Sequence, residues 1–384
     1  MVYFANKDLN RIYTHSLLFG FAENAGGVFI FVYLLKAGLG VPLVLASIGA
    51  LLTIRFAFRQ GVLPFAKRFG MRSALVMGAA LVAVSYVALA FVDAADGKLL
   101  LFMLVAAFGE AFYWSSFHAT VASLGDSHAR GAQTSAIQLV YALTSVIGPI
   151  AGGFALAFIG PKAAFFAAAV AQGLSVIPLS HLPYMPVPQA AKLQPAANRI
   201  AAMAYFGDGI MAAGHAFTWS MALFITLGEQ FQAYGLAQAL AALCGAVMAL
   251  RLGRLIDAGH PKRSAAIGFS AIALVVVLKA LFYATPALAL VALAASAVAA
   301  PIYSSAYNSR IYNLAQASGD ALRFHVSGEG GWDLGATLGC LSSAALIHFG
   351  FSFLPAIGLG LVGISIVSLV IRESYQKSEP SLRV

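Results

Sequence analysis

The sequence predicts an all-α membrane protein with twelve transmembrane helices in two six-helix halves. Of its 384 residues, 61% are hydrophobic and only 10% are charged. Soluble domains average about 25% charged residues, so water cannot be the main solvent of this chain. The mean hydropathy of +0.86 supports the same conclusion.

An internal repeat predicts the division into halves. Residues 112–118 (FYWSSFH) resemble residues 301–307 (PIYSSAY), and the basic turn at 67–72 corresponds to 257–262 at nearly the same offset. An offset that stays constant over half of the chain indicates a duplication. Many secondary transporters are built from such repeats, with the binding site at the interface between them.

Each helix is predicted from its length and composition, because crossing a bilayer takes about 20 mostly apolar residues. Twelve such segments follow one another at 12–36, 41–63, 71–93, 98–124, 132–159, 162–183, 198–227, 231–251, 263–283, 286–315, 322–348 and 350–372. The longest connection contains four prolines and is typical of a linker. We therefore expect an N-terminal half at 1–183, a cytoplasmic linker at 184–197 and a C-terminal half at 198–384.

The placement of lysine and arginine predicts the orientation, because short cytoplasmic loops are richer in these residues. Every second predicted loop is basic and the alternate loops are almost bare. The basic positions include Arg59, Lys67, Arg68, Arg72, Lys192, Arg199, Arg251, Arg254, Lys262, Arg263, Arg372, Lys377 and Arg383. We expect both termini in the cytoplasm and the chain in the inner (plasma) membrane. The asymmetry explains the net charge of +9 without a nucleic-acid partner.

Twelve helices in a six-plus-six repeat resemble the major facilitator superfamily over nearly the whole chain. That family carries Gly-x-Leu-x-Asp-x-x-Gly and basic residues after helices 2 and 8. The second copy here, GRLIDAG at 253–259, contains the aspartate as Asp257, whereas the first copy has Lys67 in its place. The resemblance implies that Asp257, with Arg68 and Arg72, forms a cytoplasmic gate that one conformation closes. An ordinary basic loop is the alternative.

The fifth predicted helix contains Gly148, Pro149, Gly152 and Gly153 in the order Gly-Pro-x-x-Gly-Gly. This resembles an element of drug:proton antiporters in the same superfamily. Proline removes a backbone donor and bends a helix, and glycines let a neighbouring helix approach closely. The resemblance implies a bend that seals the outer part of the cavity, with plain helix packing as the alternative.

Ionisable residues within predicted spans indicate a functional site, because they are costly in a bilayer unless they face a cavity or a partner. Five acids qualify: Glu23, Glu110, Asp208, Glu329 and Asp333. Helical spacing adds neighbours on shared faces, namely Trp114 and His118 with Glu110, His215 and Trp219 with Asp208, and Tyr303, Tyr307 and Arg310 on the tenth predicted helix. These residues are the candidate substrate- and proton-binding set. A structural ion pair with Arg55 or Arg310 is the alternative for any one acid.

In the family that the chain resembles, helices 1, 4, 7 and 10 line the central cavity. Glu23, Glu110 and Asp208 fall on that set, whereas Glu329 and Asp333 fall on helix 11 and are weaker candidates. Glu110 and His118 form the best candidate relay for protons, since histidine changes its charge near neutral pH.

An acidic cavity with aromatic walls suits a cationic or amphipathic solute, and burial favours the protonated form of a carboxyl group. We predict a monomeric, proton-coupled secondary transporter that exports small organic solutes and needs no cofactor or bound metal. An importer of a transition metal such as copper, through Asp208, Met211 and His215, is one alternative. A symporter of another small solute is a second. The sequence contains no nucleotide-binding loop, His-Glu-x-x-His or nucleophile elbow, so an enzyme is not expected.

Overall fold

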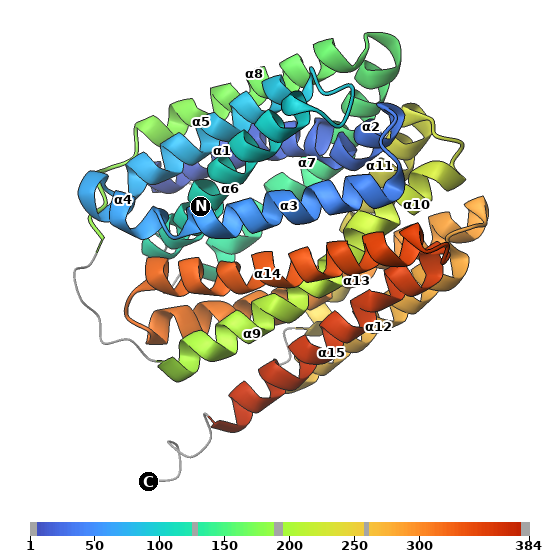
Figure 1. Cartoon of the computed structure of the whole chain (residues 1–384). Coiled ribbons are helices and arrows are strands. Elements are labelled where there is room, and N and C mark those ends of the chain that lie inside the picture. Colours follow the sequence, from blue (N-terminus) through green and yellow to red (C-terminus); the bar gives the residue numbers. More distant parts are fainter. Residues whose placement is uncertain (1–5, 125–129, 188–194, 257–260, 378–384) are drawn as a thin grey trace.

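The computed structural model describes residues 6–124, 130–187, 195–256 and 261–377, and these form helices joined by short connections (Figure 1). The elements are α1 (Lys7–Ala25), η1 (Gly27–Phe29), α2 (Ile30–Lys36), α3 (Val41–Arg59), α4 (Val62–Phe69), α5 (Met71–Leu89), α6 (Gly97–Leu124), α7 (Arg130–Phe158), α8 (Pro161–Ser180), α9 (Pro195–Ala212), η2 (Ala213–Thr218), α10 (Trp219–Thr226), α11 (Phe231–Ile256), α12 (Pro261–Phe282), α13 (Pro286–Ala317), α14 (Ala321–His348) and α15 (Phe353–Lys377).

The all-α membrane fold predicted from the sequence is confirmed. Within the described ranges, eleven helices are long and apolar enough to cross a membrane. The remaining predicted span corresponds to α14, which has 28 residues but is less apolar because it carries Glu329 and Asp333. Two predicted spans are interrupted: the first consists of α1, η1 and α2, and the seventh of α9, η2 and α10.

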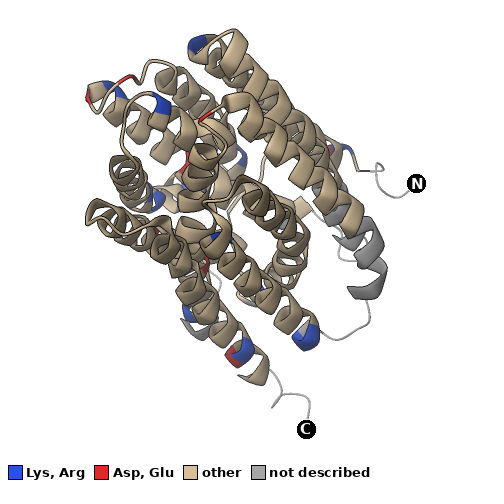
Figure 2. Ribbon diagram, turned by 90° about the vertical axis from the view of Figure 1, so that its right-hand side faces the viewer, with Lys and Arg blue, Asp and Glu red and all other residues tan. Residues whose placement is uncertain are grey.

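The outward faces of the helices are apolar. Large side chains such as Leu139, Phe158, Val170, Phe349 and Leu369 are each more than 60% exposed. Figure 2 shows long uncharged stretches of ribbon along the helices. Exposing apolar surface to water costs roughly 25 cal/mol per Å², so these faces belong in lipid.

The helices of residues 7–180 form one body in Figure 1 and those of residues 195–377 form the other. The two bodies meet where α3 packs against α14 and where α7 packs against α11. The α7–α11 crossing is close, because a Cβ added at Gly235 would lie 2.2 Å from the carbonyl oxygen of Pro149. The boundaries at 183 and 197 stay a proposal, with the last turn of α8 at Ser180 and the start of α9 at Pro195.

The Gly-Pro-x-x-Gly-Gly element lies at the crossings of α7 with its neighbours. A Cβ added at Gly152 would lie 2.1 Å from the carbonyl oxygen of Ala25, so the backbones of α1 and α7 touch there. Gly148 packs in the same way against Asn24, and Gly153 against Phe231 of α11. Pro149 lies inside the helix between them. The element therefore packs α7 against α1 in one body and α11 in the other.

We expect Gly152→Val to lower the melting temperature of the purified protein. The new side chain would overlap the α1 backbone, and overpacking costs about 1–3 kcal/mol or more. Gly173→Val on α8 is the matched control, because open space surrounds a Cβ at that position. Equal melting temperatures for the two variants would contradict the close α1–α7 packing.

Candidate functional site

A buried ion network joins the two bodies. Arg55 and Arg59 lie four residues apart on α3, and Glu329 and Asp333 lie four residues apart on α14. Residues with this spacing share a helix face, and the two faces meet where α3 packs against α14. Two arginines on one helix therefore oppose two acids on the other.

Arg59 is the most enclosed of the basic groups in the network, with 1% of its side chain exposed. Its Nε donates to Asp333 Oδ2 at 2.7 Å and its Nη1 donates to Glu329 Oε2 at 2.6 Å. Nη1 also donates to Ser115 Oγ at 2.8 Å. A buried charge is tolerated when it is both paired and hydrogen-bonded, and Arg59 meets both conditions.

Arg55 connects the network to α6. Its Nε donates to Asp333 Oδ1 at 2.7 Å, and its Nη1 pairs with Glu110 Oε2. Its guanidinium carbon also lies 4.9 Å from the centroid of the Trp332 ring. The alternative of Arg55 as a structural partner therefore describes Glu110 and Asp333, whose carboxylates are both bonded to Arg55.

The sequence places Arg59 among the basic residues of the cytoplasmic side, which stays a prediction, but its side chain is buried and is not part of an exposed basic cluster. It lies at the last residue of α3, yet it points into the protein because its partners on α14 lie there. The matched four-residue spacing of two arginines and two acids was present in the sequence and could have indicated the network. Glu329 and Asp333, the weaker candidates by helix number, are its central acids.

Two cavities lie on either side of Arg55, Trp114 and Trp332, which line both. The first, here the Glu23 cavity, has a volume of about 180 Å³ and also contains Glu110. The second, here the Asp208 cavity, has a volume of about 380 Å³. It is lined further by His118, Tyr205, Asp208, Tyr303, Tyr307, Tyr312 and Glu329. Aromatic side chains thus form much of the wall around Asp208.

The two carboxyl groups that give these cavities their names are held by neutral donors. Tyr86 donates its hydroxyl to Glu23 Oε2 at 3.1 Å. Asp208 accepts from the Tyr303 hydroxyl at 2.5 Å and from Trp332 Nε1 at 3.0 Å. In the part of the chain that the structure describes, neither acid forms an ion pair with lysine or arginine.

His118 lies beside Glu329, whereas Glu110 is bonded elsewhere. The Nε2 atom of His118 is 3.8 Å from Glu329 Oε1, and the His118 ring stacks on His325 with a centroid distance of 5.4 Å. The Tyr312 hydroxyl lies 3.2 Å from His118 Nδ1. The predicted direct relay from Glu110 to His118 therefore differs from the observed pairing, since the side chain of Glu110 turns toward Arg55.

His215 and Trp219 do not share the Asp208 cavity. The prediction assumed a continuous α-helix from Asp208 to Trp219, but η2 is a π-helical segment that changes the register between them. His215 and Trp219 instead contact Lys279 of α12, which donates to the His215 carbonyl at 3.0 Å and lies 5.0 Å from the Trp219 ring centroid.

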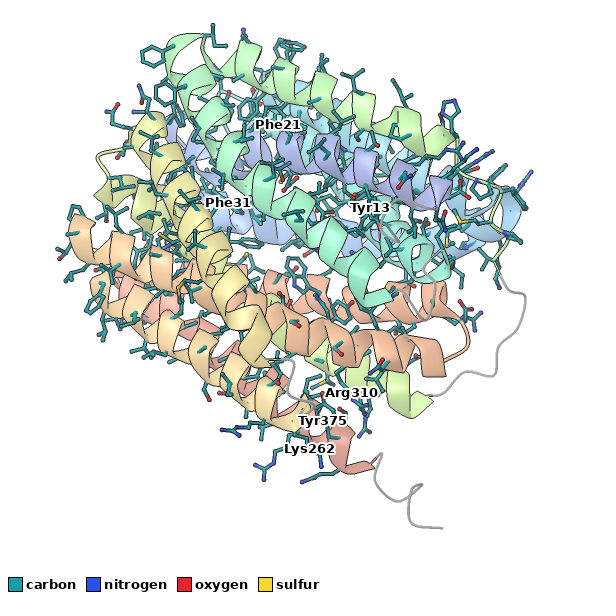
Figure 3. All side chains as sticks on the ribbon, turned by 180° about the vertical axis from the view of Figure 1, so that it is seen from behind. Tyr13, Phe21, Phe31, Lys262, Arg310 and Tyr375 are labelled. Atoms are coloured by element: carbon teal, nitrogen blue, oxygen red, sulfur yellow. The ribbon has the colours of Figure 1, made fainter. Side chains whose placement is uncertain are left out.

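Arg310 is also directed away from the cavities. Its Nε donates to Ser374 Oγ at 2.8 Å, and its guanidinium carbon lies 4.8 Å from the centroid of the Tyr375 ring. Figure 3 shows Arg310 and Tyr375 close together near the end of α15. Tyr303 and Tyr307 line the Asp208 cavity as the shared face predicted, with ring centroids 5.6 Å apart.

Of the predicted cytoplasmic gate, Asp257 lies outside the described residues. Arg68 is exposed at the end of α4, and Arg72 Nη1 donates to the Leu182 carbonyl at 2.8 Å. Arg72 therefore holds the chain just after α8, and the gate itself stays a proposal.

The comparisons with known proteins agree with this architecture. Residues 61–328 match the model of the Major Facilitator Superfamily. The chain belongs to this superfamily. Membership makes it a multi-pass membrane protein and a secondary transporter of a small molecule, and not an enzyme. No curated protein matches the chain.

Solved structures of superfamily transporters share the fold. The human organic anion transporter MFSD10 (TETRAN) is 15% identical, with a TM-score of 0.68 over 95% of this chain and 98% of that one. A POT family transporter in complex with 5-aminolevulinic acid is 14% identical, with a TM-score of 0.66 over 96% of each chain. A peptide transporter POT is 14% identical, with a TM-score of 0.68 over 98% of this chain and 96% of that one. Identities this low show the fold alone.

Proposed function

We propose that the protein is a proton-coupled secondary transporter that exports small cationic or amphipathic organic solutes. Asp208 carries this proposal. It is a partly buried carboxyl group in an aromatic cavity, and its hydrogen-bond partners are neutral. Such a site favours either a proton or an organic cation, and the two would compete for it.

The charges around the two cavities support a cationic cargo. Among the described residues lining them, the acids Glu23, Glu110, Asp208 and Glu329 face the bases Arg55 and Arg59. Adding Asp333, which both arginines bind, increases the excess of acid. An excess of carboxylate in buried and partly buried positions is costly unless protons or a cationic solute compensate it.

The chemistry of the wall around Asp208 supports an organic cation over a metal or an anion. Tyrosine and tryptophan faces attract organic cations at about 0.5–2 kcal/mol each. His215, a metal ligand in the alternative drawn from the sequence, contacts Lys279 and does not line the Asp208 cavity. Both arginines are already occupied by carboxylates, which disfavours an anionic cargo.

Transport in proteoliposomes tests the proposal. With a pH gradient imposed, wild-type protein should move a fluorescent organic cation such as ethidium, and Asp208→Asn should reduce the rate at least about tenfold by removing the charge that binds it. Asp93→Asn is the matched control, since that carboxyl group is exposed outside the cavities. Equal rates for wild type and Asp208→Asn, or no dependence on the pH gradient, would contradict the proposal.

We further propose that the termini and the linker face the cytoplasm, on the basis of the basic loops. In a Cys244→Ser background, which removes the native exposed thiol, a cysteine at exposed Asp96 should react with an impermeant thiol reagent in intact cells. A cysteine at Tyr184, which is also exposed, should react only after the cells are opened. The reverse labelling pattern would overturn this orientation.

A further inference from the structure

Trp332 contacts both Asp208 and the ion network through different parts of one side chain. Its indole N–H donates to Asp208 Oδ2 at 3.0 Å, and its ring face lies 4.9 Å from the guanidinium carbon of Arg55. Arg55 in turn pairs with Glu110 and Asp333. The indole therefore links the Asp208 side chain itself to Arg55 of the ion network.

The backbone around Trp332 is held firmly. A Cβ added at Gly209, next to Asp208, would lie 2.3 Å from the carbonyl oxygen of Trp332, and one at Gly335 would lie 2.0 Å from the carbonyl oxygen of Phe206. Because α9 and α14 touch at the backbone, Asp208 and Trp332 stay in register. Side chains, and not the backbone, are therefore the parts of this site that can move.

The two contacts of the indole depend on different charges. The hydrogen bond to Asp208 is strongest when Asp208 is ionised, because an ionised acceptor roughly doubles the strength of a hydrogen bond. A proton or a bound cation on Asp208 weakens that bond and frees the indole. A freed indole no longer keeps its ring face over Arg55, and the hold of Arg55 on Glu110 changes with it.

We propose that Trp332 couples the substrate site to the ion network, so that occupancy of Asp208 and the pairing of Arg55 with Glu110 depend on one another. Trp332 is a positioning residue in this scheme, acting through Asp208 and Arg55. The inference rests on the proposed function for the identity of the cation. It extends that function by naming Trp332 as the side chain through which a cation bound at Asp208 affects the pairing of Glu110. Energetic coupling of this kind is reciprocal.

A double-mutant cycle tests the coupling with tetraphenylphosphonium as the probe cation. The dissociation constant is measured by calorimetry for wild type, Glu110→Gln, Trp332→Phe and the double variant. Glu110→Gln should change affinity about fivefold or more when Trp332 is present. It should change affinity less than about twofold in Trp332→Phe, which keeps an aromatic ring but lacks the N–H. An equal effect of Glu110→Gln in both backgrounds would overturn the inference.

Two controls separate coupling from simple attraction and from damage to the fold. Glu23→Gln removes an acid from the Glu23 cavity, which also contains Glu110, without removing a partner of Arg55. Its effect on the dissociation constant should therefore be the same with and without Trp332. Trp219→Phe removes an indole outside both cavities and should leave the effect of Glu110→Gln unchanged. Loss of that effect in Trp219→Phe as well would also overturn the inference.

A measurement without ligand keeps the inference testable if the cargo is not an organic cation. The part of the tryptophan emission that is lost in Trp332→Phe is followed over a pH series. Asp208→Asn and Glu110→Gln should each alter it, because both acids act on the same indole. If Glu110→Gln leaves it unchanged, Trp332 does not couple the sites. Failure of tetraphenylphosphonium to bind wild type would instead count against the proposed function alone.

Discussion

Replacing Arg59 with methionine is expected to destabilise the protein by about 3–5 kcal/mol, the usual effect of breaking a buried ion pair from one side. Glu329 and Asp333 would lose a guanidinium group that now binds both at 2.6–2.7 Å. Asp333 is fully buried, so water cannot replace the bond that it would lose. A lower melting temperature and a lower yield of folded protein in size-exclusion chromatography would measure the effect.

A second substitution separates loss of charge balance from loss of packing. Arg59→Met combined with Glu329→Gln restores the balance of the network, because Arg55 still holds Glu110 and Asp333. The double variant should therefore be more stable than Arg59→Met alone. Arg372→Met, at an exposed position on α15, should be close to wild type. If the single and double variants melt together, charge in this network does not hold the two bodies.

Neutralising Glu110 should separate proton coupling from substrate binding. Arg55 keeps Asp333 as a partner in Glu110→Gln, and Glu110 is 30% exposed, so the fold should survive. We expect transport driven by a pH gradient to fall at least about tenfold, because Arg55 loses the partner whose pairing we propose depends on the occupancy of Asp208. Exchange of substrate without a gradient should persist in part.

Both activities are measured in the same proteoliposomes. Glu229→Gln is the matched control, since that acid is exposed and only loosely paired with Lys36 at 3.9 Å. Gradient-driven transport that survives Glu110→Gln would show that coupling does not need the pairing of Glu110 with Arg55. Asp208 would then be the first acid to examine for coupling on its own, and Glu329 the second.

Much of the fold and part of the site follow from the sequence. The residues that determine helices are local, and long apolar segments separated by glycine, proline and basic loops suffice to place them. Acids within such segments indicate a site whatever their partners are, so Glu23, Glu110 and Asp208 could be identified. The burial of Arg59 was missed because its position at the end of α3 resembles the start of a basic loop when its partners are unknown.

The sequence by itself determined that this chain crosses a membrane on many helices, has an internal repeat and carries acids at depth. Tertiary structure alone decided which groups meet. The π-helical segment at Ala213–Thr218 removed His215 from the face of Asp208, and the crossing of α3 and α14 brought Arg59 to Glu329. Helical periodicity relates neighbours within one helix only. A pair from two helices depends on where those helices cross, and that crossing is set by the packing of the whole bundle.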